Sequence, residues 1–256
     1  MINNRLTNIF KSSNEPLLNI YFTAGFPHKE DTISILNELN NAKCDIVEIG
    51  MPYSDPLADG PTIQNSSMVA LKNGIKLKDI FRQIKEARKT IEIPIVLMGY
   101  INQVMQYGFE NFIHSCKDSG VDGLIIPDLP ADVYEKEYKT LFEENNIAIS
   151  FLITPQTDDE RIKYLANLSN GFLYVVSSFS VTGSSISVKE EQFLYLEKIK
   201  NLNLTANTMV GFGISDKETF DTFSKFTNGC IIGSAFINML KKDGIKGINN
   251  FIKDFK

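Results

Sequence analysis

Cysteine, histidine and tryptophan are scarce in this chain of 256 residues, which has three cysteines, two histidines and no tryptophan. Cys44, Cys116 and Cys230 form an odd, widely spaced set, so we expect structural thiols and neither a disulfide framework nor a zinc cluster. His28 and His114 are too few to build a metal site on their own. We therefore expect no metal and no metal-dependent chemistry.

Long apolar runs and concentrated positive charge are also missing. No run approaches the roughly 20 apolar residues of a membrane span, and residues 1–6 lack the apolar core of a signal peptide. The lysines are scattered and the net charge is −5, so the chain offers no basic surface for nucleic acid and no attraction to an anionic membrane. We expect a cytoplasmic protein.

Short apolar segments alternate with amphipathic helical segments along the whole chain. We expect strands over residues 17–23, 45–49, 93–98, 123–126, 148–153, 172–176, 208–210 and 229–232. Helical patterns follow these strands, as in residues 29–41, 131–145 and 189–201, and one more helix is expected ahead of the first strand.

Eight such β–α units in about 240 residues are typical of an α/β fold, the (β/α)8 TIM barrel, here with an extra N-terminal helix. We expect one domain over residues 1–256, because no linker or low-complexity tract interrupts the alternation. A doubly wound open sheet is the main alternative. It would normally carry a glycine-rich dinucleotide fingerprint after the first strand, and none is present there.

Two carboxylates, Glu48 and Asp59, stand at the end of the second strand and in the loop that follows it. Strand alternation should point Val47 and Ile49 towards the helices, and Ile46 and Glu48 into the barrel. An acid buried at the rim of a barrel would have a raised pKa, which suits proton transfer near neutral pH.

Each acid also has a structural alternative. Glu48 could be a buried carboxylate bonded to backbone or to a lysine, and Asp59, in Asp-Gly-Pro before a helix, could be a helix cap. Asp55, in Ser-Asp-Pro, reads as an ordinary turn residue. Spacing alone leaves the role of Asp59 open.

Small residues follow the last three expected strands, in residues 181–185 (VTGSS), 211–215 (GFGIS) and 233–235 (GSA). Glycines let backbone N–H groups approach an anion, and a helix N-terminus adds its dipole. Because barrel enzymes often bind phosphate with the loops after strands seven and eight, the pattern predicts a phosphate site there. Tight turns are the alternative. The residues together predict acid/base chemistry on a small phosphorylated molecule.

The run from Glu48 to Gln64 (EIGMPYSDPLADGPTIQ) resembles the signature of the tryptophan synthase α subunit, and GFGIS and GSA also match. The order of elements agrees along essentially the whole chain. The resemblance implies a lyase that cleaves indole-3-glycerol phosphate to indole and glyceraldehyde 3-phosphate by a retro-aldol reaction without a cofactor. Glu48 would be the general acid/base, and Asp59 would hold the indole N–H.

The resemblance also implies substrate-binding roles for residues at matching positions. The indole pocket would be walled by Tyr21, Met98 and Phe212. Tyr174 would hydrogen-bond the substrate, and Thr182 would meet Asp59 when its loop closes. The phosphate would be bound by Gly183, Gly213, Gly233 and Ser234.

A partner is implied as well: the tryptophan synthase β subunit, a pyridoxal-phosphate enzyme, in an α2β2 complex that Asp55 would face. This chain itself should bind no pyridoxal phosphate. One departure is the stretch 178–180, which reads Ser-Phe-Ser where the family usually has Arg, a small residue and Gly. A hinge glycine and a cation are therefore absent from the loop.

Two other functions compete with the lyase. One is another phosphate-binding barrel enzyme, such as a sugar-phosphate isomerase or epimerase, although a metal-dependent epimerase would need histidines at several strand ends. The other is a partner-activating subunit with weak catalysis of its own, which the departure at 178–180 motivates.

Overall fold

Parallel strands form the centre of the structure, a computed structural model that describes residues 2–56, 59–177, 188–211 and 213–256. The strands are β1 Leu17–Thr23, β2 Ile46–Gly50, β3 Ile95–Met98, β4 Gly123–Ile125, β5 Ala148–Ile149, β6 Leu152–Ile153, β7 Leu173–Val176, β8 Thr208–Gly211 and β9 Gly229–Ile232. Their order in the sheet is β5-β4-β3-β2-β1-β9-β8-β7-β6. The two outer strands in this order, β5 and β6, are consecutive in the chain, so the sheet closes into the expected barrel.

The closing strand is split, although one strand over 148–153 was expected. Ser150 N–H still donates to the Leu124 carbonyl on one side, and the Phe151 carbonyl accepts from Tyr174 N–H on the other. In between, the Ser150 hydroxyl oxygen accepts from Phe172 N–H, and the Ser169 hydroxyl oxygen accepts from Phe151 N–H. Serine hydroxyls thus replace part of the backbone ladder, which explains the break.

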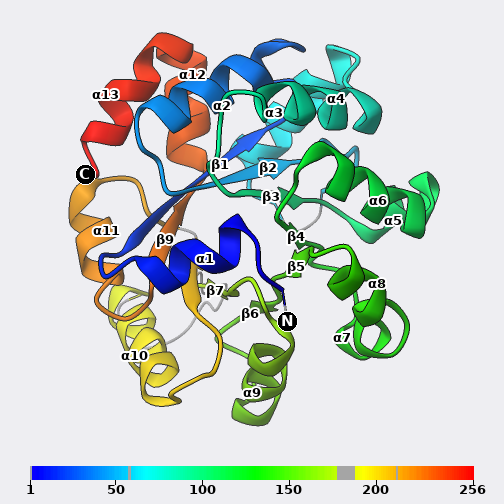
Figure 1. Cartoon of the computed structure of the whole chain (residues 1–256). Helices are drawn as coiled ribbons and strands as arrows, with labels where there is room; N and C mark the ends of the chain where they lie inside the picture. The colour runs from blue at the N-terminus through cyan, green and yellow to red at the C-terminus, as the bar shows by residue number, and fades with distance from the viewer. Residues whose placement is uncertain (1, 57–58, 178–187, 212) are drawn as a thin grey trace.

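Helices surround the strands (Figure 1). They are α1 Arg5–Ser12, α2 Asp31–Asn41, α3 Pro61–Lys72, α4 Leu77–Ala87, α5 Ile101–Tyr107, α6 Phe109–Ser119, α7 Ala131–Val133, α8 Lys139–Glu144, α9 Asp159–Leu168, α10 Val188–Asn201, α11 Lys217–Phe223, α12 Ser234–Asp243 and α13 Ile248–Lys253, with a 3-10 turn over Ile245–Gly247. The single helix expected over 131–145 contains a π turn, Tyr134–Tyr138, between α7 and α8. That wider turn stacks Tyr138 on Phe109 with ring centroids 3.6 Å apart.

Side-chain alternation along the strands separates two apolar layers. Val47 and Ile49 pack in the outer layer between strands and helices, whereas Ile46 packs inside the barrel. The interior cluster also takes inward residues from β1, β3 and β7, such as Leu17, Val96 and Tyr174. The predicted inward and outward phase of β2 is confirmed.

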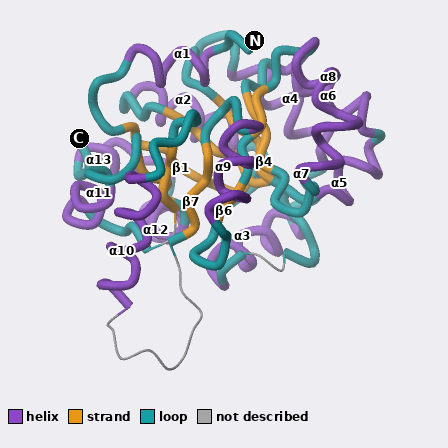
Figure 2. The backbone as a smooth tube through the Cα atoms, turned by 90° about the horizontal axis from the view of Figure 1, so that it is seen from below, coloured by secondary structure: helices purple, strands orange, loops and turns teal. Residues whose placement is uncertain are grey.

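Helix α1 covers the amino-terminal end of the barrel, at one end of the strands in the view of Figure 2. Leu6 of this helix is fully buried in the interior cluster. A Cβ added at Gly123 would lie 2.8 Å from Leu6 Cδ2, and one at Gly171 would lie 3.2 Å from it. The absence of side chains at the two glycines therefore leaves room for Leu6 to pack into this end of the barrel interior.

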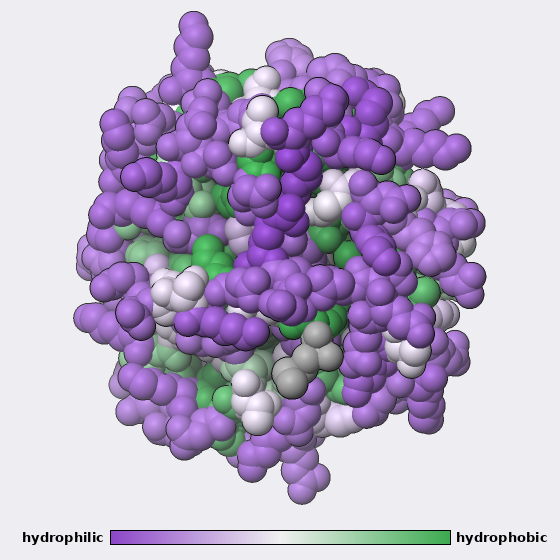
Figure 3. Space-filling view, in the orientation of Figure 1, coloured by the Kyte–Doolittle hydropathy of each residue, from purple (hydrophilic) through white to green (hydrophobic). Residues whose placement is uncertain are grey.

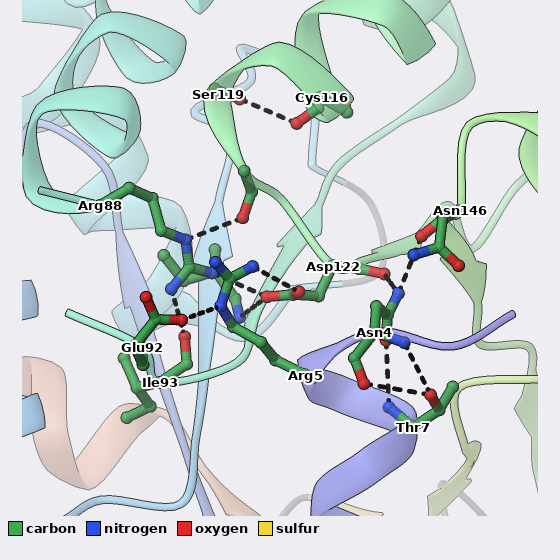
Figure 4. A network of polar contacts seen from close by, with 12 residues as sticks. Asn4, Arg5, Thr7, Arg88, Glu92, Ile93, Cys116, Ser119, Asp122 and Asn146 are labelled. Carbon is green, nitrogen blue, oxygen red and sulfur yellow. Dashed lines mark hydrogen bonds and ion pairs between the residues drawn. The ribbon is translucent and has the colours of Figure 1, made fainter.

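Charged groups anchor α1 to the same end (Figure 4). Asp122, directly before β4, forms ion pairs with Arg88 at 2.7 Å and with Arg5 of α1 at 3.2 Å. Arg5 also pairs with the exposed Glu92 at 2.6 Å, and Asn4 Nδ2 donates to the Asp122 carbonyl at 2.7 Å. Asp122 and Arg88 are buried, so this network is structural and lies at the end of the barrel away from Glu48.

Hydrophilic side chains cover most of the face seen in Figure 3, and hydrophobic surface shows only as small separated areas. All three cysteines are free and buried. None of the helices in the described ranges is long and apolar enough to cross a membrane.

Candidate active site at the carboxyl end of the barrel

A cavity of about 330 Å³ opens at the carboxyl ends of the strands. Eight of the residues predicted from the sequence line it: Tyr21, Glu48, Asp59, Met98, Tyr174, Gly213, Gly233 and Ser234. Further lining comes from Gly60, Ile63, Ile214, Ser215, Ile231, Ala235 and Asn238. Thr182, Gly183 and Phe212 lie outside the described residues, as does the stretch 178–180. The structure thus gathers residues from β1, β2, β3, β7 and the region after β8 and β9 around one space.

Glu48 is the most deeply buried acid of this cavity. It lies in β2, faces inward and is 1% exposed. Burial is the main cause that raises the pKa of its carboxyl group to about 8, and the nearby Asp59 raises it further. The Asn19 amide opposes this rise by donating from Nδ2 to Glu48 Oε2 at 3.3 Å. No lysine pairs with Glu48 among the described residues, so the carboxyl group is largely protonated at neutral pH.

Asp59 lies in the loop between β2 and α3 and is only partly buried. Burial raises the pKa of its carboxyl group to about 6, while a hydrogen bond from the Tyr100 hydroxyl to Oδ2, at 3.4 Å, lowers it. The N-cap of α3 is Gly60 and has no side-chain cap bond, so the alternative in which Asp59 caps the helix does not fit. At neutral pH Asp59 is mostly ionised beside a mostly neutral Glu48.

Two buried tyrosines form the inner walls of the cavity. Tyr21 and Tyr174 are each 6% exposed, and burial raises the pKa of both phenols, so both are neutral donors. A Cβ added at Gly50 would collide with the Tyr21 hydroxyl, and one at Gly211 with the Tyr174 hydroxyl. These two glycines are therefore required by the close approach of the rings.

Another part of the cavity lining is the start of helix α12, where backbone N–H groups are available. Helix α12 begins at Ser234 with Gly233 as its N-cap and no side-chain cap bond, so its first N–H groups lack a side-chain acceptor. Gly213, nearby in the lining, has φ +78, which a glycine adopts without strain. No lysine or arginine lines the cavity among the described residues. An anion would therefore be held by N–H groups and the helix dipole.

Asp55 is not part of this cavity. It is exposed, and it lines a separate cavity of about 550 Å³ with Lys76, the N-cap of α4, and residues of α4 and α5 such as Leu77 and Asn102. Its carboxylate accepts a hydrogen bond from the Ser54 hydroxyl.

Sequence reasoning did not find Asn19 or Tyr100, the two residues that bond the acids. Asn19 carries a usable signal, because it is a polar side chain at an inward position of the apolar strand LLNIYFT. Tyr100 carries none, because it reaches Asp59 from the loop after β3, at a distance of 41 positions in the chain. Among the described residues, no group of three or more His, Cys, Asp or Glu side chains could hold a metal ion.

A family model described as "Tryptophan synthase alpha chain" matches residues 8–255. The tryptophan synthase alpha chain of Flavobacterium psychrophilum is 49% identical over 238 residues, which are 93% of this chain and 94% of the relative. That of Flavobacterium johnsoniae is 49% identical over 253 residues, 99% of this chain and 100% of the relative.

Solved structures agree with the sequence relatives. The tryptophan synthase subunit alpha of Legionella pneumophila has a TM-score of 0.87 at 30% identity and covers 99% of this chain and 97% of its own. The tryptophan synthase complex of Pyrococcus furiosus has a TM-score of 0.84 at 34% identity and covers 100% of this chain and 99% of its own.

Proposed function

Because the chain belongs to the tryptophan synthase alpha chain family, we propose that it cleaves indole-3-glycerol phosphate to indole and glyceraldehyde 3-phosphate in tryptophan biosynthesis. The observation that supports this most is the arrangement of the 330 Å³ cavity. A buried neutral acid and an ionised acid both line it, and an uncapped helix N-terminus lies in the same lining. The reaction needs these three groups and no cofactor.

The first step uses Glu48 as an acid. Its carboxyl group gives a proton to C3 of the indole ring, which places a positive charge on the ring and its nitrogen. The ionised Asp59 accepts the indole N–H and stabilises this charge. Two carboxyl groups with pKa values on either side of neutrality can divide the roles in this way.

The second step uses Glu48 as a base. The resulting carboxylate takes the proton from the hydroxyl on the side-chain carbon bonded to C3. The bond between that carbon and C3 breaks, its electron pair returns to the ring, and the hydroxyl carbon becomes the aldehyde. Indole keeps the proton gained at C3, and Glu48 ends protonated as it began.

The remaining lining residues would bind and orient the substrate. Tyr21 and Met98 would wall the indole ring, and the Tyr174 hydroxyl would hydrogen-bond the substrate. N–H groups around Gly213, Gly233 and Ser234 would hold the phosphate at the start of α12. We propose the same site for Phe212, Thr182 and Gly183, whose positions in the sequence match the family pattern.

The test is indole release from purified protein and indole-3-glycerol phosphate, alone and with a cognate β subunit. We expect Glu48→Gln and Asp59→Asn each to lower kcat by about 10²- to 10⁴-fold, because neither amide can exchange a proton or carry the charge. Glu86→Gln, an exposed carboxylate on α4, should keep the normal rate. No indole from the unsubstituted protein in either condition would refute the proposal.

We also propose that the partner is the tryptophan synthase β subunit, in an α2β2 complex in the cytoplasm. The exposed Asp55 and the second cavity beside it would lie at the contact. Analytical ultracentrifugation of the mixed subunits tests this, and Asp55→Lys should weaken assembly without changing the rate of the isolated chain.

The partner-activating subunit with weak catalysis is the second candidate, and Ser-Phe-Ser at 178–180 is the feature that favours it. Single-turnover rates of the free and assembled chain separate the two. A slow chemical step in both, together with faster β-subunit turnover in the complex, would support the second candidate.

A further inference from the structure

Asn19 is an unusual residue for its position. It lies in β1 between Leu17 and Tyr21, both of the interior apolar cluster, and shares their inward face. Its side chain is fully buried. In the register of the sheet it pairs with Ile46, two positions before Glu48 on the neighbouring strand.

The amide of Asn19 is only half satisfied. Nδ2 donates to Glu48 Oε2 at 3.3 Å, and Asn19 is the one hydrogen-bond partner of Glu48 in the described part of the chain. Oδ1 is buried and has no partner there. An unpaired buried carbonyl costs stability, and leucine, which has the same shape, would avoid that cost. Stability alone therefore does not explain an amide at this position.

The contact with Glu48 supplies a better explanation. An amide N–H can only donate, so the oxygen it contacts must act as an acceptor and is disfavoured as the site of a proton. A protonated Glu48 held in this way carries its proton on Oε1. Glu48 lines the cavity. Because Oε2 is bonded to Asn19, Oε1 is the oxygen left to bond a molecule in the cavity.

We propose that Asn19 is a positioning residue for the lyase reaction: its amide fixes Glu48 Oε2 as an acceptor and keeps the exchangeable proton of Glu48 on Oε1, next to the substrate. The inference rests on the proposed function, because it assumes that Glu48 exchanges protons with the substrate. Charged and titratable groups that also face Glu48 are Asp59 from the loop after β2, Tyr21 from β1 and Tyr174 from β7.

Asn19→Leu is the central experiment, since leucine keeps the shape and removes both polar atoms. We expect kcat for indole release to fall by about ten- to a hundredfold, the value of a hydrogen bond to an ionisable group, with KM changed by less than about twofold. The decline of the rate at high pH, where Glu48 loses its proton, should move to higher pH, because the hydrogen bond from Asn19 lowers the pKa of Glu48. The thermal midpoint should stay the same or rise.

Asn19→Asp has the same shape and replaces the donor by a second carboxylate. Two adjacent carboxylates share a proton, so the pH–rate limb should move up further than in Asn19→Leu. Gln83→Leu is the matched control, because Gln83 is also fully buried with one amide oxygen unpaired, yet it bonds Lys29 and Glu30 away from the cavity. It should change stability only.

A ¹³C NMR titration of the Glu48 carboxyl carbon, assigned with Glu48→Gln, gives a readout that needs no turnover. An upward pKa shift in Asn19→Leu but not in Gln83→Leu, together with the loss in kcat, supports the inference. An unchanged titration or an unchanged kcat in an active, folded Asn19→Leu protein overturns it. If the unsubstituted protein releases no indole, the proposed function fails instead, and the titration still tests the Asn19 contact.

Discussion

At the scale of residues, two chemically similar acids differ because their surroundings differ. Burial raises the pKa of Glu48 to about 8 and that of the less buried Asp59 to about 6. Lysine and arginine are missing from the described cavity lining, so no cation pulls either value down. Between these two values one acid holds a proton and the other holds a charge, which is the combination that the proposed reaction needs.

We therefore expect a bell-shaped dependence of kcat/KM on pH. The rate should fall as pH rises through about 8, where Glu48 loses its proton, and fall as pH drops through about 6, where Asp59 gains one. Initial rates of indole release across this range measure both limbs. In Asp59→Asn the acid limb should disappear from the residual activity, and a profile with both limbs intact would contradict the assignment.

The stability of the folded protein should also depend on pH through Glu48. The pKa of Glu48 is raised from 4.5 to about 8 on folding, so the folded state binds this proton more tightly than the unfolded state. The stabilisation that the protonated Glu48 contributes is fully present below about pH 4.5 and is lost as the pH rises through about 8. Glu48→Gln, which cannot ionise, should thus raise the thermal midpoint at pH 9 and much less at pH 5. Equal shifts at both pH values would show that Glu48 titrates normally.

Residue-level prediction from sequence worked where the pattern is local. Alternation in β2 placed Glu48 inside the barrel without any other information, and the structure confirms the phase through Ile46. The partners of the acids could not be predicted in this way. Asn19 reaches Glu48 from β1, and Tyr100 reaches Asp59 from the loop after β3. This proximity exists only after the barrel closes.

At the scale of elements, apolar periodicity predicted the eight strand regions and most of the helices, and most boundaries lie within a residue or two of those observed. β1 Leu17–Thr23 agrees fully, because this segment, apolar apart from Asn19 and Thr23, has clear ends. The break between β5 and β6 and the π turn after α7 were not foreseen. Both depend on side chains of neighbouring elements, the serine hydroxyls and the ring of Phe109.

The network that anchors α1 and β4 should contribute unequally to stability. Arg88→Met leaves the buried Asp122 carboxylate with the Arg5 cation and the hydrogen bond from Ile95 N–H, so we expect a loss of about 3 kcal/mol in the free energy of unfolding. Glu92→Gln removes a pair at the surface and should cost under about 1 kcal/mol, after allowance for solvent screening. Urea unfolding measures both. A small loss for Arg88→Met would mean that Arg5 or water compensates, and the network would not be the anchor.

The start of α12 should decide phosphate affinity. A side chain at Gly233 would point towards Tyr21 and Ile63 in the cavity lining, and its Cβ would meet Tyr21 at an ordinary 3.4 Å. Gly233→Ala should thus fold normally and raise KM only modestly. Gly233→Asp adds a negative charge at the same place and should raise KM by about tenfold or more through repulsion of the phosphate. Equal KM values for the two variants would show that the phosphate does not bind at the start of α12.

At the scale of the whole molecule, the two ends of the chain meet in the barrel. β1 pairs with β9, and the cavity lining runs from Tyr21 to Asn238. The long run from Glu48 to Gln64 made the family recognisable, but no local pattern shows which loops come together at the rim. Sequence alone therefore predicted the scaffold and its chemistry better than the contacts inside the site.

We propose that residues 1–256 form one domain, and this leads to a prediction about ligand binding. A phosphate ligand at α12 contacts a cavity built from both the first and the last strands, so it should stabilise the entire chain. Glycerol 3-phosphate at about 100 times its Kd should add about 2.7 kcal/mol to the free energy of unfolding. Differential scanning calorimetry should show the whole heat-absorption profile move up in temperature, and Gly233→Asp, with an affinity about tenfold weaker, should reduce the added stability to about 1.4 kcal/mol or less without lowering the unliganded midpoint. A transition that stays in place while another moves would reveal a second, independent domain, because a unit without contacts to the cavity gains nothing from the ligand.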